Sequence, residues 1–311
     1  MNISKYLLAL LSAAILGTAA AQTAAPRLPI GTSSGLLGPL GQWNRATFDE
    51  AKRAGIDAVE INAATLFLNS SLTDDRQVAA RCRQLRRDLR RSGLQLWSVH
   101  MPYGKDIDLS NTDPQIHDNT MAIHRRVLRF CKILRPHIVL FHPSWNLPHN
   151  VREERMAQLV ASVRELLPAA HKFGATVVIE NMLGYELVKD ENYERPLCRS
   201  VEEVMKIMSM MPDDVYAAVD MNHIDNPERL VSALGTRLRT IHVSDGDGRS
   251  ECHELPWHGR GDNDWVAILK ALYEDAHYDG VFMYELKKAE LPQLKECYDK
   301  MYRQYLESNE K

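Results

Sequence analysis

The chain has 311 residues, of which 45% are hydrophobic and 25% are charged, and its formal net charge is −3. This is the composition of a globular protein long enough for one large barrel or two mid-sized domains. The slight negative charge excludes a general electrostatic attraction to nucleic acids or anionic membranes, so we expect no nucleic-acid partner.

The N-terminal segment differs from the rest of the chain. Lys5 gives it a positive start, the stretch from Tyr6 to Ala20 is almost wholly apolar, and three small residues, Ala19 to Ala21, follow. This pattern is typical of a secretory signal peptide cleaved near Ala21. A single membrane anchor is the alternative, but the apolar stretch is short of the ~20 residues of a span. We therefore expect a periplasmic or secreted protein with no stable membrane anchor, in which residues 22–311 form the mature domain.

The cysteines give no sign of a structural framework. They are odd in number, widely spaced and without a CxxC motif: Cys82, Cys131, Cys198, Cys252 and Cys297. This pattern argues against a disulfide framework or a zinc–thiolate site, and leaves one bridge open in an oxidising compartment.

After Pro29 the chain alternates short apolar runs with longer amphipathic ones. The predicted strands are, in chain order, 30–37, 57–62, 95–100, 137–142, 176–181, 216–220, 240–244 and 281–286. The predicted helices span 45–54, 75–92, 114–134, 152–173, 201–211, 227–238, 265–276 and 291–306. Short strands that alternate with helices of ten or more residues indicate parallel β-α-β units.

Local signals support these boundaries. Asp113 and Asn226 each precede a proline, as residues at helix N-termini do, and Gly55, Gly93 and Gly174 stand where left-handed C-terminal caps are expected. Eight units in about 280 mature residues match the size of a closed eight-stranded barrel. An open doubly wound sheet is the alternative, but no strand is followed by a GxGxxG turn. We therefore predict an α/β fold, a single-domain (β/α)8 TIM barrel.

Ionisable residues close six of the predicted strands. Four consecutive strands end in Glu180, Asp220, His242 and Glu285, and two earlier ones end in His100 and His142. Any one of them alone would more often be a turn, cap or structural residue. In a barrel, however, the carboxyl ends of all strands converge at one mouth, where catalytic groups lie. Three carboxylates and one imidazole suit a single divalent cation, Mn²⁺ first, with Mg²⁺, Co²⁺, Fe²⁺ or Zn²⁺ as alternatives.

At these residues the sequence resembles the xylose-isomerase-like barrel superfamily, over residues 30–306. The motifs that carry the resemblance are Ser98–Tyr103, Phe141–Pro143, Ile179–Asn181, Val219–His223, Ile241–Asp245 and Tyr284–Lys287. The superfamily includes the D-tagatose and D-psicose 3-epimerases, the inosose-pathway isomerases and the apurinic endonucleases.

The resemblance to the ketose 3-epimerases implies roles for individual residues. The implied metal ligands are Glu180, Asp220, His242 and Glu285. Glu180 and Glu285 would also exchange protons with the substrate carbon, and Glu186 and His223 stand where those epimerases contact substrate hydroxyls. The epimerase arginine six residues after the metal histidine is replaced by Gly248, with Arg249 one step later, which leaves the substrate open.

The expected chemistry is proton abstraction. A cation that chelates a carbonyl oxygen and a neighbouring hydroxyl acidifies the C–H bond between them by stabilising an enediolate. Glu180 and Glu285 come from the fifth and eighth strands, so we expect them to flank the substrate as an acid/base pair. Further candidate substrate contacts are His100, His142, Arg249, His253, His258, Trp145 and Trp257. For the loop histidines and the tryptophans, solvation and packing are the alternatives.

Several functions are compatible with this site. We expect a metal-dependent isomerase or epimerase of a keto-sugar or related polyol; a lyase or hydrolase of 3-keto-glycosides is the alternative, which export favours. An apurinic endonuclease is a further alternative, but the Asp-x-His step of its trinuclear zinc pattern is not evident where this chain has Glu251-Cys252-His253. A sugar-binding barrel without catalysis is also open. The expected partner is a small-molecule carbohydrate, and analogy adds a homodimer.

Overall fold

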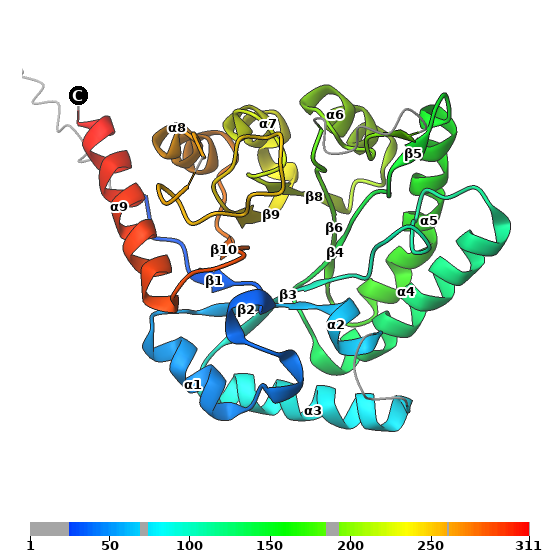
Figure 1. Cartoon of the computed structure of the whole chain (residues 1–311), viewed down its shortest axis with the longest axis horizontal. Coiled ribbons are helices and arrows are strands. Elements are labelled where there is room, and N and C mark those ends of the chain that lie inside the picture. Colours follow the sequence, from blue (N-terminus) through cyan, green and yellow to red (C-terminus); the bar gives the residue numbers. More distant parts are fainter. Residues whose placement is uncertain (1–24, 69–73, 185–192, 260, 311) are drawn as a thin grey trace, which may run out of the picture.

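The computed structural model describes residues 25–68, 74–184, 193–259 and 261–310. Their centre is a closed barrel of parallel strands with helices around it (Figure 1). Around the barrel the strands run in the order β1 (Ile30–Thr32), β10 (Phe282–Tyr284), β9 (Leu238–Val243), β8 (Val215–Asp220), β6 (Thr176–Glu180), β4 (Ile138–Phe141), β3 (Gln95–His100) and β2 (Ala58–Asn62). The predicted single-domain TIM barrel is confirmed.

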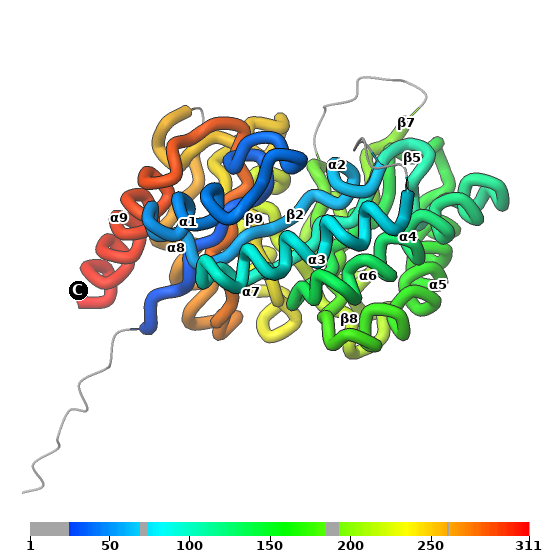
Figure 2. The backbone as a smooth tube through the Cα atoms, turned by 90° about the horizontal axis from the view of Figure 1, so that it is seen from below, coloured from blue at the N-terminus to red at the C-terminus, as the bar shows by residue number. Residues whose placement is uncertain are grey.

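The α-helices cover the outside of the barrel. They are α1 (Arg45–Arg53), α2 (Ala63–Phe67), α3 (Asp75–Ser92), α4 (Pro114–Leu134), α5 (Arg152–His171), α6 (Val201–Met210), α7 (Pro227–Leu234), α8 (Trp265–Lys270) and α9 (Leu291–Asn309). Figure 2 shows α1, α3 and α4 side by side along one flank. The predicted helix signals hold, since Asp113 caps the first turn of α4 and Gly93 ends α3 with a φ of 72°.

Three predicted elements change conformation before their predicted ends. The strand predicted at 30–37 stops at Thr32, because Ser34–Leu37, with Gly35 inside the apolar run, forms a 3-10 turn instead. The helix predicted at 227–238 stops at Leu234, because Gly235 follows with a φ of 52°. The helix predicted at 265–276 continues beyond α8 as one π-helical turn, Ala271–Asp275.

A short antiparallel ribbon lies outside the barrel. Its strands β5 (Leu147–Pro148) and β7 (Tyr193–Glu194) belong to the loops that follow β4 and β6, and they lie side by side in Figure 2. The ribbon therefore joins two loops at the carboxyl end of the barrel.

The barrel interior is closely packed. A side chain on Gly31 would meet Val281 Cγ1 at 2.5 Å and Met283 Cε at 2.6 Å, so only glycine fits where β1 passes β10. All five cysteines fall within the described residues and are free thiols. No helix of the described segments is long and apolar enough to cross a bilayer.

Candidate active site

The carboxyl ends of four neighbouring strands bring four ionisable side chains together. Glu180 ends β6, Asp220 ends β8, His242 is the penultimate residue of β9 and Glu285 directly follows β10. Each offers one potential ligand atom, and these atoms all lie within 4.8 Å of one another. His242 Nδ1 lies 2.6 Å from Glu180 Oε1 and 2.9 Å from Glu285 Oε2. We call these four residues the central group; they are the four expected to bind one cation.

Glu60 of β2, which was not predicted as a site residue, contacts the central group from across the barrel. Its Oε2 lies 3.1 Å from His242 Nε2 and accepts a hydrogen bond of 2.6 Å from Ser98 Oγ. Glu60 is only 1% exposed. A carboxylate on the far nitrogen of a ligating histidine fixes the ring and raises its basicity. The available signal was an acidic residue inside the otherwise apolar run of the second strand.

Two further groups of potential ligands adjoin the central group and share a carboxylate with it. His100 Nε2 and His142 Nε2 lie 3.5 and 3.2 Å from Glu180 Oε2. On the other side, His223 Nε2 lies 3.7 Å from Asp220 Oδ2. The three groups therefore form a continuous row in which Glu180 and Asp220 stand at the junctions.

Glu251 completes the group beside Asp220. Its Oε2 lies 3.1 Å from His223 Nε2 and 2.8 Å from His253 Nε2. No Asp-x-His step is evident in the sequence here, yet Glu251 and His253 both lie against His223. The longer glutamate side chain reaches the same pair of imidazoles from the loop after β9.

Backbone carbonyls orient three of the imidazoles. His100 Nδ1 donates to Met101 O at 3.1 Å, His223 Nδ1 to Asn181 O at 3.0 Å, and His253 Nδ1 to Glu285 O at 3.2 Å. A carbonyl can only accept, so each Nδ1 carries the proton and each Nε2 points into the site. Such contacts on the far nitrogen select the tautomer of metal-binding histidines.

Protons on the imidazoles offset part of the negative charge of the site. Burial lowers the pKa of His100, but Glu180, Glu60 and Glu285 outweigh it and raise that pKa to about 9. Against the same cost of burial, nearby carboxylates raise the pKa of His242 well above its ordinary value. Burial raises the pKa of the Asp220 carboxyl to about 6.

Two buried oxygens in the central group lack hydrogen bonds. They are Glu180 Oε2 and Asp220 Oδ2, the atoms at the junctions of the three groups. A buried carboxylate oxygen that accepts no hydrogen bond is costly, and coordination of a cation removes that cost. The donor set and these two atoms therefore fit a divalent cation.

A cavity of about 320 Å³ opens above the site. Its lining includes the following predicted site residues: His100, His142, Trp145, Glu180, His223, His253 and Glu285. It also includes residues that the sequence analysis did not single out as contacts: Tyr103, Ser144, Arg195 and Glu251. The Tyr103 ring stacks on His142 with 3.9 Å between centroids, and the Trp145 side chain is half-exposed.

Other predicted contacts lie elsewhere. Arg249 lines a separate cavity of about 410 Å³ together with Asp225 and Asp247. Trp257 lies under Lys300, whose Nζ is 3.6 Å from the ring centroid. His258 is exposed and does not line the central cavity. Glu186 and the expected signal peptide, residues 1–21, lie outside the described residues.

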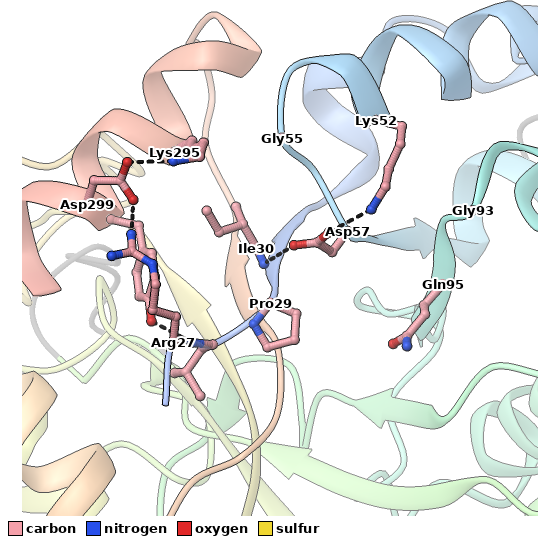
Figure 3. Close-up of a pocket in the computed structure, with 12 residues that line it drawn as sticks. Arg27, Pro29, Ile30, Lys52, Gly55, Asp57, Gly93, Gln95, Lys295 and Asp299 are labelled. Carbon is pink, nitrogen blue, oxygen red and sulfur yellow. Dashed lines mark hydrogen bonds and ion pairs between the residues drawn. The ribbon is translucent and has the colours of Figure 1, made fainter. Parts of the chain in front are cut away.

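A larger cavity, of about 500 Å³, lies at the opposite end of the barrel, where the strands begin (Figure 3). Its charged residues pair with each other: Lys52 Nζ lies 2.7 Å from Asp57 Oδ1, and Lys295 Nζ lies 2.6 Å from Asp299 Oδ2, which Arg27 also contacts. No charged residue of this lining is left without a partner of opposite sign, so the carboxyl end is the better candidate for a functional site.

Comparisons with known proteins agree with this architecture. The family model described as xylose isomerase-like TIM barrel matches residues 48–303. The uncharacterized protein MJ1614 of Methanocaldococcus jannaschii is 22% identical over 206 residues, which cover 66% of this chain and 76% of that protein.

Solved structures show the same fold. A D-tagatose 3-epimerase-like protein superimposes with a TM-score of 0.71 at 20% identity, covering 90% of this chain and 99% of that one. The 3-keto-D-glucoside 4-epimerase of E. coli gives a TM-score of 0.65 at 16% identity, covering 89% and 100% of the two chains. At these identities the likeness concerns the fold.

Proposed function

This chain belongs to the xylose isomerase-like TIM barrel family, and on that premise we propose that it is a sugar isomerase or epimerase that depends on one divalent cation, Mn²⁺ first among the candidates. The observation that carries the proposal is the central group, in which Glu180, Asp220, His242 and Glu285 offer ligand atoms within 4.8 Å of one another. The epimerase names of two structural neighbours support the choice of reaction class.

The proposed mechanism uses the two glutamates as proton carriers. A bound divalent cation would supply the Lewis acidity that stabilises an enediolate on a keto-sugar. Imidazole protons hold the pKa of Glu180 well below its ordinary value in spite of burial, and that of Glu285 likewise, so both carboxylates are ionised, the form that a general base requires. They come from different strands, so one can remove a proton and the other can return it on the opposite side.

The test is hydrogen exchange in deuterated water. The mature protein, loaded with Mn²⁺, is incubated with D-fructose and D-tagatose, and deuterium at the carbons next to the keto group is followed by NMR. We expect exchange that Glu180→Gln and Glu285→Gln each slow by about 10²- to 10⁴-fold. Glu307→Gln, an exposed change on α9, is the matched control.

The two-base mechanism would be refuted if both glutamine variants bound Mn²⁺ and kept the full exchange rate. Loss of exchange together with loss of Mn²⁺ would instead identify the glutamates as metal ligands, and the exchange rate at saturating Mn²⁺ separates the two roles.

A second candidate is a lyase or hydrolase of 3-keto-glycosides. Trp145 and Asn146 line both the central cavity and a neighbouring one of about 460 Å³, which Tyr193 also lines. This adjoining space suits a substrate longer than a monosaccharide. Release of nitrophenol from a nitrophenyl 3-keto-glucoside would favour this candidate, whereas deuterium exchange without release would favour the epimerase.

The row of three ligand groups is also compatible with the apurinic endonuclease alternative. Counting the ions per chain by metal analysis distinguishes the candidates. We expect one tightly held ion; three ions together with nicking of abasic DNA would favour the nuclease.

We further propose that the protein is exported and starts at Gln22 after cleavage. N-terminal sequencing of the protein from a periplasmic extract tests this proposal. A chain that keeps Met1 in the cytoplasm would contradict it. The homodimer stays a prediction.

A further inference from the structure

Arg195 is a buried cation for which the described residues provide no ion-pair partner. It follows β7 directly, its side chain is 9% exposed, and it lines the central cavity. In the part of the chain that the structure describes, neither Nε nor Nη2 has a hydrogen-bond partner. No described carboxylate lies within ion-pair distance of it; Glu251 acts on it only at longer range, and burial lowers the pKa of the guanidinium.

Two other shielded arginines nearby behave differently. Arg155 pairs with Asp108, and Arg152 Nη2 lies 2.7 Å from Glu203 Oε2. Burying an unpaired ion costs several kcal/mol, which is why buried arginines are normally paired. Arg195 is therefore the exception among them, and it is the one that faces the cavity.

The backbone around Arg195 is held firmly from behind. Arg152 donates to Arg195 O at 2.8 Å and to Pro196 O at 2.9 Å, and Leu197 N donates to Ser144 Oγ at 2.8 Å. The ribbon of β5 and β7 fixes the preceding residues. These contacts hold the main chain in place while leaving the guanidinium donors of Arg195 free.

The central cavity has apolar lining residues as well as three carboxylates, Glu180, Glu251 and Glu285, each of which lies against an imidazole. Trp145, Met182 and Leu183 line the same cavity and limit the access of water, which strengthens a charge-assisted hydrogen bond. The planar guanidinium presents a fork of donors that matches the two oxygens of a carboxylate or phosphate.

We propose that Arg195 binds an oxyanion of the substrate, so that the sugar acted on at the central group carries a carboxylate or a phosphate. The inference rests on the proposed function, because it assumes that the central cavity holds the sugar. It adds the substrate class, an acidic rather than a neutral sugar.

The test is a comparison of binding to the Mn²⁺-loaded protein by calorimetry. The probes are D-glucose, D-glucuronate and D-glucose 6-phosphate, which differ only in the group at C6. We expect at least one anionic sugar to bind about 10- to 100-fold more tightly than glucose, as one charged hydrogen-bonding partner allows. Comparison of glucuronate with glucose 6-phosphate tells carboxylate from phosphate.

Variants assign the preference to Arg195. Arg195→Met should abolish it, and Arg195→Lys should retain part of it, because lysine keeps the charge and loses the fork. Arg249→Met, which removes an exposed arginine from a different cavity, should leave it unchanged. An anion preference that survives Arg195→Met would place the anion elsewhere in the site, and equal binding of all three sugars to the wild-type protein would overturn the proposal.

Stability and exchange give independent readouts. Because Arg195 is unpaired, Arg195→Met should unfold at no lower denaturant concentration than the wild type; a large loss would show a structural role and overturn the proposal. Deuterium exchange into D-fructose, D-fructuronate and D-fructose 6-phosphate tests the proposed function separately. Exchange without anion preference refutes the role of Arg195 alone, whereas anion binding without exchange refutes the reaction alone.

Discussion

The two ends of the barrel treat charge in opposite ways. At the amino end the charged residues around the cavity neutralise one another, as Lys52 and Asp57 do, and their side chains are 43% and 44% exposed. At the carboxyl end the charges are buried, and among the described residues Asp220 Oδ2 and two donors of Arg195 have no hydrogen-bond partner. Exposed ion pairs need no further partner, whereas buried polar atoms without a hydrogen bond favour the binding of a ligand.

This contrast distinguishes residues that contribute to stability from residues that contribute to function. Exposed ion pairs contribute about 0–1 kcal/mol each. A buried charge without a partner lowers stability, so its presence at the carboxyl end indicates a site prepared for a cation and a substrate. Changes at the two ends should therefore affect different measurements.

The largest effect is expected from Asp220→Asn at the carboxyl end. Asp220 is fully buried and belongs to two of the three groups of potential ligands. Affinity for Mn²⁺ and kcat/KM should each fall by more than about 100-fold. Loss of a residue that only hydrogen-bonds to a metal ligand already costs about 10- to 100-fold, and Asp220 is itself a proposed ligand. Manganese titration by electron paramagnetic resonance measures the Mn²⁺ affinity. An unchanged affinity would contradict the assignment of the carboxyl end as the metal site.

A smaller effect is expected from Glu60→Gln, which acts through His242. Mn²⁺ affinity should fall by about 10- to 100-fold, because the imidazole loses the carboxylate that orients it. The pKa of His242 in the metal-free protein should also fall, since Glu60 is among the carboxylates that raise it. NMR titration of the imidazole measures this. An unchanged His242 pKa would contradict the positioning role, and Ser98→Ala, which removes only the contact to Glu60, should have a weaker effect.

The third prediction concerns the pH dependence of the metal-free protein. Carboxylates outweigh burial and raise the pKa of His223 to about 10 and that of His253 to about 8, from an ordinary 6.5. A raised pKa stabilises the fold fully below 6.5, and this stabilisation is lost as the pH rises through the folded-state values. The free energy of unfolding should therefore fall by a few kcal/mol between pH 6.5 and 10, in the order of magnitude given by 1.4 kcal/mol per pKa unit.

Denaturant unfolding in the presence of a chelator measures this slope. Glu251→Gln, which removes the carboxylate shared by both imidazoles, should flatten it. A metal-free protein whose stability rises over this range would contradict the assignment.

The smallest effect is expected at the amino end, from Lys52→Met. The pair with Asp57 is half-exposed, so the free energy of unfolding should fall by less than about 1 kcal/mol. The kcat/KM value should stay that of the wild type. Denaturant unfolding measures the free energy of unfolding, and the exchange assay measures kcat/KM. A loss of activity in this variant would contradict the distinction between the two ends.

The fold was predictable because its signals are local and repeated. The alternation of runs gave eight strands within a few residues of those observed, and caps such as Asp113 and Gly93 lie where the pattern indicated. Errors fell where a glycine interrupts an apolar or helical run, at Gly35 and Gly235. Hydrophobic periodicity shows that a strand or helix is present, but it does not show at which residue the backbone changes conformation.

The sequence by itself determined which side chains meet at the central group, because residues at the ends of parallel strands in a closed barrel must converge. Tertiary structure alone decided that Glu60 reaches His242 from the opposite wall, that Glu251 joins His223, and that Arg195 faces the cavity while Arg249 does not. Strand periodicity fixes the direction of a side chain within its own strand. Distances across the barrel and the paths of loops depend on packing between segments far apart in the chain, and that information is absent from any local pattern.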